Sequence, residues 1–115
     1  MKERAIFILL IEDDIADATI KKQQLEDIGY SINHFISAEE ALDVIDTNII
    51  IDIVLIGVEL TNNEDCFELA KKVLAKKDVP IVFLLSNLKQ EIIKKIDNVT
   101  SYGYVLKNTD VTSID

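Results

Sequence analysis

Nearly continuous aliphatic runs alternate along this chain with segments of helical periodicity. The runs at residues 5–11, 49–56 and 80–85 ("AIFILLI", "IIIDIVLI" and "PIVFLL") contain few polar positions. Such density is typical of strands that are covered on both faces of a sheet. Residues 30–35 and 102–106 are more mixed, and they predict two edge strands.

Four segments between these runs predict helices. The first covers residues 16–28 and ends at Gly29, a residue that readily takes the left-handed conformation closing a helix. The second begins at "SAEE", where Ser37 and Glu40 have the spacing of a capping box. The third and fourth are indicated by apolar stripes of three residues each: Phe67, Ala70 and Leu74, then Ile92, Ile93 and Ile96.

The alternation of strands and helices predicts an α/β fold with a doubly wound parallel sheet and helices on both faces. In such a sheet the functional crevice lies beyond the carboxyl ends of the strands. We therefore expect the residues that follow or end four of the strands to meet there. These are Glu12, Asp13 and Asp14, then Gly57, then Leu85 and Ser86, and finally Lys107.

Composition limits the class of protein. A length of 115 residues is enough for a single domain with one hydrophobic core. The formal net charge of −9 would repel a nucleic-acid backbone, so we expect no direct nucleic-acid partner. The one cysteine, Cys66, cannot form a disulfide framework, and we expect it to be a packing residue. With no apolar run of membrane-spanning length, we expect a soluble cytoplasmic protein.

Six segments match, in order, the landmarks of a known family: "ILLIEDDIADA", "GYSINHFISAEEAL", "IDIVLIGVEL", "FELAKKV", "VPIVFLLS" and "YGYVLKN". The chain resembles the receiver domains of two-component response regulators over essentially its whole length. The resemblance implies a CheY-like, flavodoxin-like five-stranded sheet of order 2-1-3-4-5. It also implies a role in phosphorelay signal transduction, without enzymatic activity of its own.

The resemblance also implies roles for individual residues. Glu12 and Asp13 match the acidic pair that binds magnesium in the family, and Lys107 matches the lysine that contacts the phosphoryl group. Tyr104 matches an aromatic residue that family members reorient on activation. Glu59 lies where the family supplies a backbone carbonyl to the metal, so the implied magnesium ligands are Glu12, Asp13 and Glu59.

Two departures from the family pattern concern phosphoryl transfer. Gly57 stands at the phosphoacceptor position, and a glycine has no carboxylate to attack phosphorus. Leu85 stands at the hydroxyl position, with Ser86 directly after it. We interpret the chain as a pseudo-receiver that acts through protein contacts and binds magnesium weakly or not at all. We expect Lys107 to pair with Asp13 or Glu12 instead.

Two other functions compete with this interpretation. A phosphate-accepting receiver would need a different acid: Asp52 lies at the far end of its strand, whereas Glu59 could bend into the space above Gly57. A nucleotide- or flavin-binding domain would need a glycine- or hydroxyl-rich loop after the first strand, where "EDDIADA" offers carboxylates. His34, on an edge strand, is expected at the surface.

The sequence also predicts how the domain connects to partners. "TDVTSID" has an N-cap candidate in Thr109 or Asp110 and reads as a fifth helix cut short, so we expect residues 1–115 to be the front part of a longer chain. The expected partners are a histidine kinase or an attached output or kinase domain, with no membrane. Self-association is expected through the fourth helix and fifth strand, near Ile93 and Tyr102.

The interpretation leads to one expectation about reconstruction. Gly57→Asp should restore magnesium binding before it restores phosphorylation, because the hydroxyl missing at Leu85 still removes one donor to the transferring group. Adding Leu85→Thr to Gly57→Asp should then improve phosphorylation.

Overall fold

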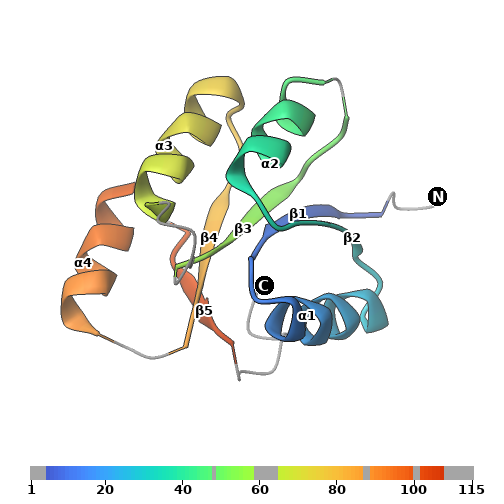
Figure 1. Ribbon diagram of the computed structural model, residues 1–115, viewed down its shortest axis with the longest axis horizontal. Coiled ribbons are helices and arrows are strands. Elements are labelled where there is room, and N and C mark those ends of the chain that lie inside the picture. Colours follow the sequence, from blue (N-terminus) through green and yellow to red (C-terminus); the bar gives the residue numbers. More distant parts are fainter. Residues whose placement is uncertain (1–4, 48, 59–64, 87–88, 100–101, 108–115) are drawn as a thin grey trace.

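The computed structural model describes residues 5–47, 49–58, 65–86, 89–99 and 102–107. In this part of the chain, five parallel strands form a sheet in the order β2-β1-β3-β4-β5, flanked by four helices (Figure 1). The strands are β1 (Phe7–Ile11), β2 (Ser31–Phe35), β3 (Ile53–Gly57), β4 (Ile81–Leu85) and β5 (Tyr104–Leu106). The helices are α1 (Ile15–Asp27), α2 (Ala38–Ile45), α3 (Cys66–Lys76) and α4 (Gln90–Val99). The predicted doubly wound α/β fold and its strand order are confirmed.

The parallel strands bring their carboxyl ends to one edge of the sheet. Ile11 at the end of β1 pairs with Ile56 in β3, and Gly57 at the end of β3 pairs with Leu84 in β4. Glu12, the residue after β1, therefore follows directly beside the end of β3. The register places Glu12 next to Gly57, the glycine that ends the third strand.

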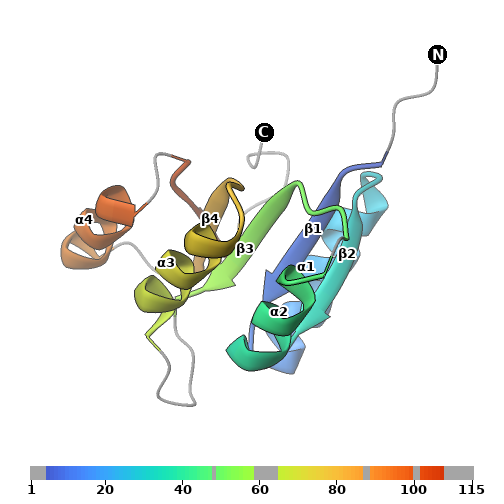
Figure 2. The same cartoon turned by 90° about the horizontal axis from the view of Figure 1, so that it is seen from above.

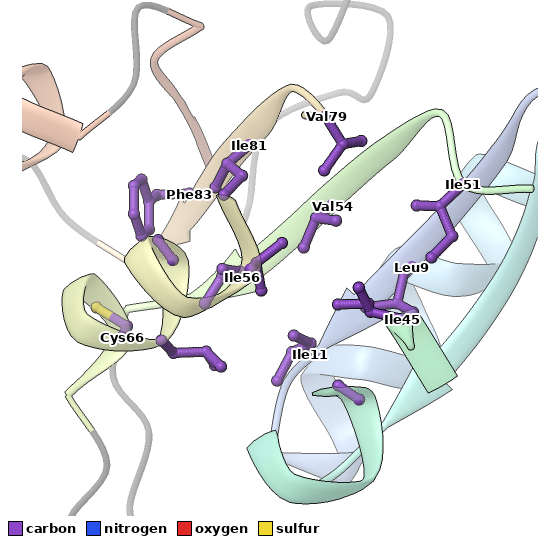
Figure 3. Packing of buried hydrophobic residues seen from close by; sticks show 14 of the residues in the cluster. Leu9, Ile11, Ile45, Ile51, Val54, Ile56, Cys66, Val79, Ile81 and Phe83 are labelled. Carbon is purple, nitrogen blue, oxygen red and sulfur yellow. The ribbon is translucent and has the colours of Figure 1, made fainter. Parts of the chain in front are cut away.

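Alternation along the strands divides the core into two layers. One layer joins the sheet to α2, α3 and α4, and a smaller layer joins the opposite face to α1 (Figures 1 and 2). Phe83 in the larger layer packs against the ring of Phe67, with ring centroids 5.2 Å apart. Figure 3 shows how side chains from successive strands meet in this layer: Leu9, Ile11, Val54, Ile56, Ile81 and Phe83.

Capping side chains fix where the helices begin. Asp14 caps α1 by accepting a hydrogen bond from the backbone N–H of Asp17 at 3.0 Å. Ser37 caps α2 and accepts from the N–H of Glu40 at 3.2 Å, as the capping-box spacing predicts. Gly29 follows α1 with a φ of 105°, so the predicted left-handed ending is confirmed.

All five strands begin later than the sequence segments predict, and the third and fifth show why. The third begins at Ile53 and not at residue 49, and Asp52 just before it accepts a hydrogen bond from the N–H of Phe7 at 2.8 Å. This contact places Asp52 at the amino end of the sheet, as expected. The fifth strand begins at Tyr104, because Gly103 has a φ of 86° and interrupts extended backbone.

The apolar stripe predicted for the third helix is partly wrong. Leu74 is 37% exposed, and the buried residues of α3 are Cys66, Leu69, Ala70 and Val73.

The sequence also did not predict the burial of Lys21, which is 1% exposed on the buried side of α1. In the described part of the chain, no helix has both the length and the apolar character that crossing a bilayer would require.

Candidate functional site

The candidate site combines residues from three strand ends and one helix. Leu10, Leu55 and Val105 belong to the core layer beneath α1. Because side chains alternate along a strand, the residue two positions later in each case points to the same side. Those residues are Glu12, Gly57 and Lys107. The sheet therefore directs the three predicted site positions toward α1.

Lys107 forms a bifurcated ion pair at this place. Its Nζ lies 3.0 Å from Oε1 of Glu12 and 3.0 Å from Oδ2 of Asp17 in the first turn of α1. The Glu12 side chain is fully buried, and the Lys107 side chain is only 11% exposed. One ammonium group thus joins the end of β5 to the end of β1 and to α1. Of the two predicted partners of Lys107, Asp13 and Glu12, the structure confirms Glu12.

Three hydrogen bonds hold Glu12 in this position. Its backbone N–H donates to the carbonyl of Phe35 at 3.1 Å, and its carboxylate Oε2 accepts from the N–H of Asp14 at 3.2 Å. Its carbonyl oxygen lies 2.7 Å from Nε2 of His34. Since a carbonyl can only accept, Nε2 of His34 carries the hydrogen. His34 is half-buried at this contact, whereas the sequence predicted a surface position.

Burial and pairing shift the titration of both partners. Burial raises the pKa of Glu12 above its ordinary 4.5, and the hydrogen bond and charge of Lys107 offset part of this change. Burial alone would lower the pKa of Lys107, but its bonds to Glu12 and Asp17 outweigh burial and raise the pKa above 10.5. The lysine therefore stays charged across the physiological range.

The remaining predicted site residues differ in their burial. Leu85 is 2% exposed and packs in the core layer of α2, α3 and α4, whereas Ser86 is exposed. Tyr104 is 37% exposed on β5, and Asp13 is half-buried. Glu59, like the fifth-helix candidates Thr109 and Asp110, lies outside the described residues.

Asp17 is the site residue that the sequence analysis missed. It stands three positions after Asp14, which caps α1, so it belongs to the first turn of that helix. The signal was the spacing of these two acids, because a first-turn carboxylate lies at the end of the helix that faces the carboxyl edge of the sheet. Helix periodicity alone does not distinguish Asp17, as a site carboxylate, from exposed acidic residues on the helix surface.

The described residues do not fit the magnesium site that the resemblance implies. Gly57 supplies no ligand, and the carboxylate of Glu12 is held by Lys107 and by the N–H of Asp14. In the described ranges, no three His, Cys, Asp or Glu side chains gather as a metal-binding group. A divalent cation would have to displace the ammonium of Lys107 to reach Glu12.

Cys66 takes no part in this site. It is 3% exposed at the start of α3 and packs in the larger core layer (Figure 3). Burial, together with the nearby charge of Asp65, raises the pKa of its thiol to about 12. The thiolate is therefore strongly disfavoured, and the prediction of a packing role is consistent with this placement.

Comparison with solved structures identifies the fold. A two-component response regulator from Clostridium difficile superposes with a TM-score of 0.82 at 26% identity, covering 95% of this chain and 88% of that one. The N-terminal domain of a response regulator/sensory box/GGDEF three-domain protein from Carboxydothermus hydrogenoformans gives 0.83 at 27% identity, covering 94% and 89%. This chain has the receiver-domain fold.

A third receiver domain is also similar in structure. The signal receiver domain of a modulated diguanylate cyclase from Desulfovibrio desulfuricans G20 gives a TM-score of 0.80 at 27% identity, covering 96% of this chain and 88% of that one. No family model and no curated protein matches the sequence. The three similar structures described above support the assignment of this chain as a receiver domain of two-component systems.

Proposed function

We propose that this receiver is a pseudo-receiver, a signalling domain that acts through protein contacts and does not accept phosphate. One observation carries the proposal. The third strand ends in Gly57, and the carboxylate above it belongs to Glu12 and is already paired with Lys107. The domain is not an enzyme under this proposal, and it needs no magnesium for its role.

Phosphoryl transfer requires a carboxylate that a donor can reach. Gly57 offers none, and the Glu12 carboxylate is fully buried and neutralised by the adjacent ammonium. Asp14 is exposed, but its Oδ1 caps α1 by accepting from the N–H of Asp17. The alternative of a receiver that uses an unusual acid thus has no support from Glu12 or Asp14.

The neighbours indicate the kind of partner. The receiver from Carboxydothermus hydrogenoformans belongs to a three-domain protein with a sensory box and a GGDEF domain, and that from Desulfovibrio desulfuricans belongs to a diguanylate cyclase. By analogy, the partner proposed here is a histidine kinase or a covalently attached output or kinase domain. The interaction takes place in the cytoplasm and involves neither nucleic acid nor membrane.

The test is exposure to a small phosphodonor. The protein is incubated with acetyl phosphate and magnesium and analysed by phosphate-affinity electrophoresis and intact mass. A receiver with an aspartate at the phosphoacceptor position serves as the positive control. We expect no phosphoryl adduct on the native chain. Stoichiometric labelling at any residue would overturn the pseudo-receiver proposal.

A further inference from the structure

Gly57 is not required by the backbone at its position. Among the described glycines, only Gly29 and Gly103 have positive φ values, 105° and 86°. Gly57 is the last residue of β3, where extended backbone accepts any L residue. A glycine in a strand normally reduces stability, since it adds chain entropy and offers no side chain to pack. The reason for this glycine must therefore lie in the space around it.

The space that a side chain at position 57 would enter is filled by Glu12. A Cβ built on Gly57 would lie 2.6 Å from Oε1 of Glu12, 2.9 Å from its Cδ and 3.1 Å from its Oε2. Real Cβ atoms essentially never lie closer than 3.0 Å to such a heavy atom, so the contacts at 2.6 Å and 2.9 Å would be steric clashes. Even an alanine at position 57 would therefore require the Glu12 carboxylate to move.

The carboxylate of Glu12 is not free to move at low cost. Oε1 lies 3.0 Å from Nζ of Lys107, and Oε2 accepts from the N–H of Asp14 at 3.2 Å. The side chain is fully buried, so water cannot replace these partners without local rearrangement. Displacing Glu12 would separate a buried ion pair, which is strongly unfavourable.

From these contacts we infer that Glu12 takes the place of the side chain missing at position 57. A carboxylate from the end of β1 crosses to the end of β3, and it positions Lys107 there. While Glu12 is paired with Lys107, its side chain thus occupies the volume that a side chain at position 57 would need. The inference rests on the proposed function and deepens it, because it assigns Glu12 as the positioning residue for Lys107.

A double-mutant cycle tests this shared volume. Gly57→Ala is made in the native chain, in Glu12→Gln and in Glu12→Ala, and thermal unfolding is measured for each. In the native chain we expect Gly57→Ala to lower Tm by roughly 5 to 15 °C through overpacking. In Glu12→Gln the loss should be similar, because glutamine keeps the volume while removing the charge.

In Glu12→Ala the sign of the effect should reverse. The volume is then empty, so Gly57→Ala should leave Tm unchanged or raise it by a few degrees through reduced chain entropy. Equal losses in the native and Glu12→Ala chains would overturn the inference. If Gly57→Ala fails to fold, failure of the double variant with Glu12→Ala would also overturn the inference. Restored folding of that double variant would support the inference.

The positioning of Lys107 needs a readout other than stability. Competitive acetylation followed by mass spectrometry measures the reactivity of each lysine in the folded protein. In Gly57→Ala, displacement of Glu12 should increase labelling of Lys107 at least about threefold while the exposed Lys71 and Lys72 stay unchanged. Unaltered Lys107 labelling would overturn the positioning role.

The two proposals fail in different experiments. Phosphorylation of the native chain would remove the pseudo-receiver proposal and leave the steric coupling between positions 12 and 57 intact. Additive effects in the double-mutant cycle would remove the coupling and leave the lack of phosphorylation unaffected.

Discussion

Nζ of Lys107 lies 3.0 Å from Oε1 of Glu12 and ties the end of the fifth strand to the end of the first. The same ammonium lies 3.0 Å from Oδ2 of Asp17, so α1 is tied to the same point. The elements thus joined are β1, β5 and α1, which are distant in sequence. This connection uses the chain's own carboxylates.

Lys107→Met should be strongly destabilising. It removes the cation that faces the buried Glu12 carboxylate, and breaking a buried pair from one side typically costs about 3 kcal/mol or more. The matched control is Lys71→Met, whose partner Glu68 and own side chain are both 62% exposed. That change should cost less than about 1 kcal/mol. Urea unfolding measures both, and equal small losses would show that Glu12 does not depend on Lys107.

The contribution of Lys107 should disappear at alkaline pH. Its pKa in the folded chain lies above the ordinary 10.5, so folding favours the protonated lysine. The stabilisation is therefore fully present below pH 10.5 and is lost as pH rises through the raised value. The free-energy difference between the native chain and Lys107→Met should therefore be constant below pH 10.5 and shrink as the pH rises above it. A difference independent of pH would contradict this.

The fold could be predicted from the sequence because its signals are local and repeated. Dense aliphatic runs gave the three central strands, and mixed composition gave β2 and β5 as edges. Strand boundaries were less predictable. The late start of β3 coincides with the hydrogen bond between Asp52 and Phe7, which joins residues 45 positions apart, and local periodicity carries no information on such a contact.

The site was predictable only in part. Topology brought Glu12, Gly57 and Lys107 together, and opposite charge gave the pairing of Lys107 with Glu12. That the Glu12 side chain fills the space above Gly57 depends on side-chain placement at atomic scale, which neither spacing nor charge specifies. Leu85 shows the same limit, because a strand end can point either to the site or into the core.

Cys66 should be inert in the folded protein. With a thiol pKa of about 12 and 3% exposure, only a very small fraction is thiolate at neutral pH, and reagents cannot reach the sulfur. Ellman's reagent should therefore give no fast reaction with the native chain and one thiol per chain in denaturant. Rapid stoichiometric reaction without denaturant would contradict the buried placement.

Self-association, where it occurs, should depend on the surface formed by α4 and β5. Tyr102 is 64% exposed and Tyr104 37% exposed, and Tyr buries apolar area while keeping a polar tip. Tyr102→Glu and Ile93→Glu should each weaken a dimer at least about tenfold by burying a charge at the interface. Sedimentation velocity measures this, with Leu74→Glu on α3 as the control at an exposed apolar position. A dimer unaffected by either change would place the interface elsewhere.

Rebuilding a phosphoacceptor should require two substitutions. The sequence alone suggests that Gly57→Asp restores magnesium binding, but its Cβ would lie 2.6 Å from Oε1 of Glu12. We therefore expect Gly57→Asp alone to be destabilised and to bind magnesium poorly. Glu12→Asp shortens the competing side chain by one methylene group and should make room for the new carboxylate. The reconstructed variant does not include Leu85→Thr, because Leu85 is a buried core residue and replacing it would reduce the stability of the fold.

The double variant Gly57→Asp with Glu12→Asp should bind magnesium at least about tenfold more tightly than either single variant, because it offers two short carboxylates at adjacent strand ends. It should also form a phosphoryl adduct with acetyl phosphate, slowly, since no hydroxyl donor is restored. Gly57→Asn with Glu12→Asp is the matched control, as it has the same volume without a nucleophile. Calorimetric titration and phosphate-affinity electrophoresis measure the two steps. Metal binding and labelling equal to that of Gly57→Asp alone would show that Glu12 does not obstruct position 57.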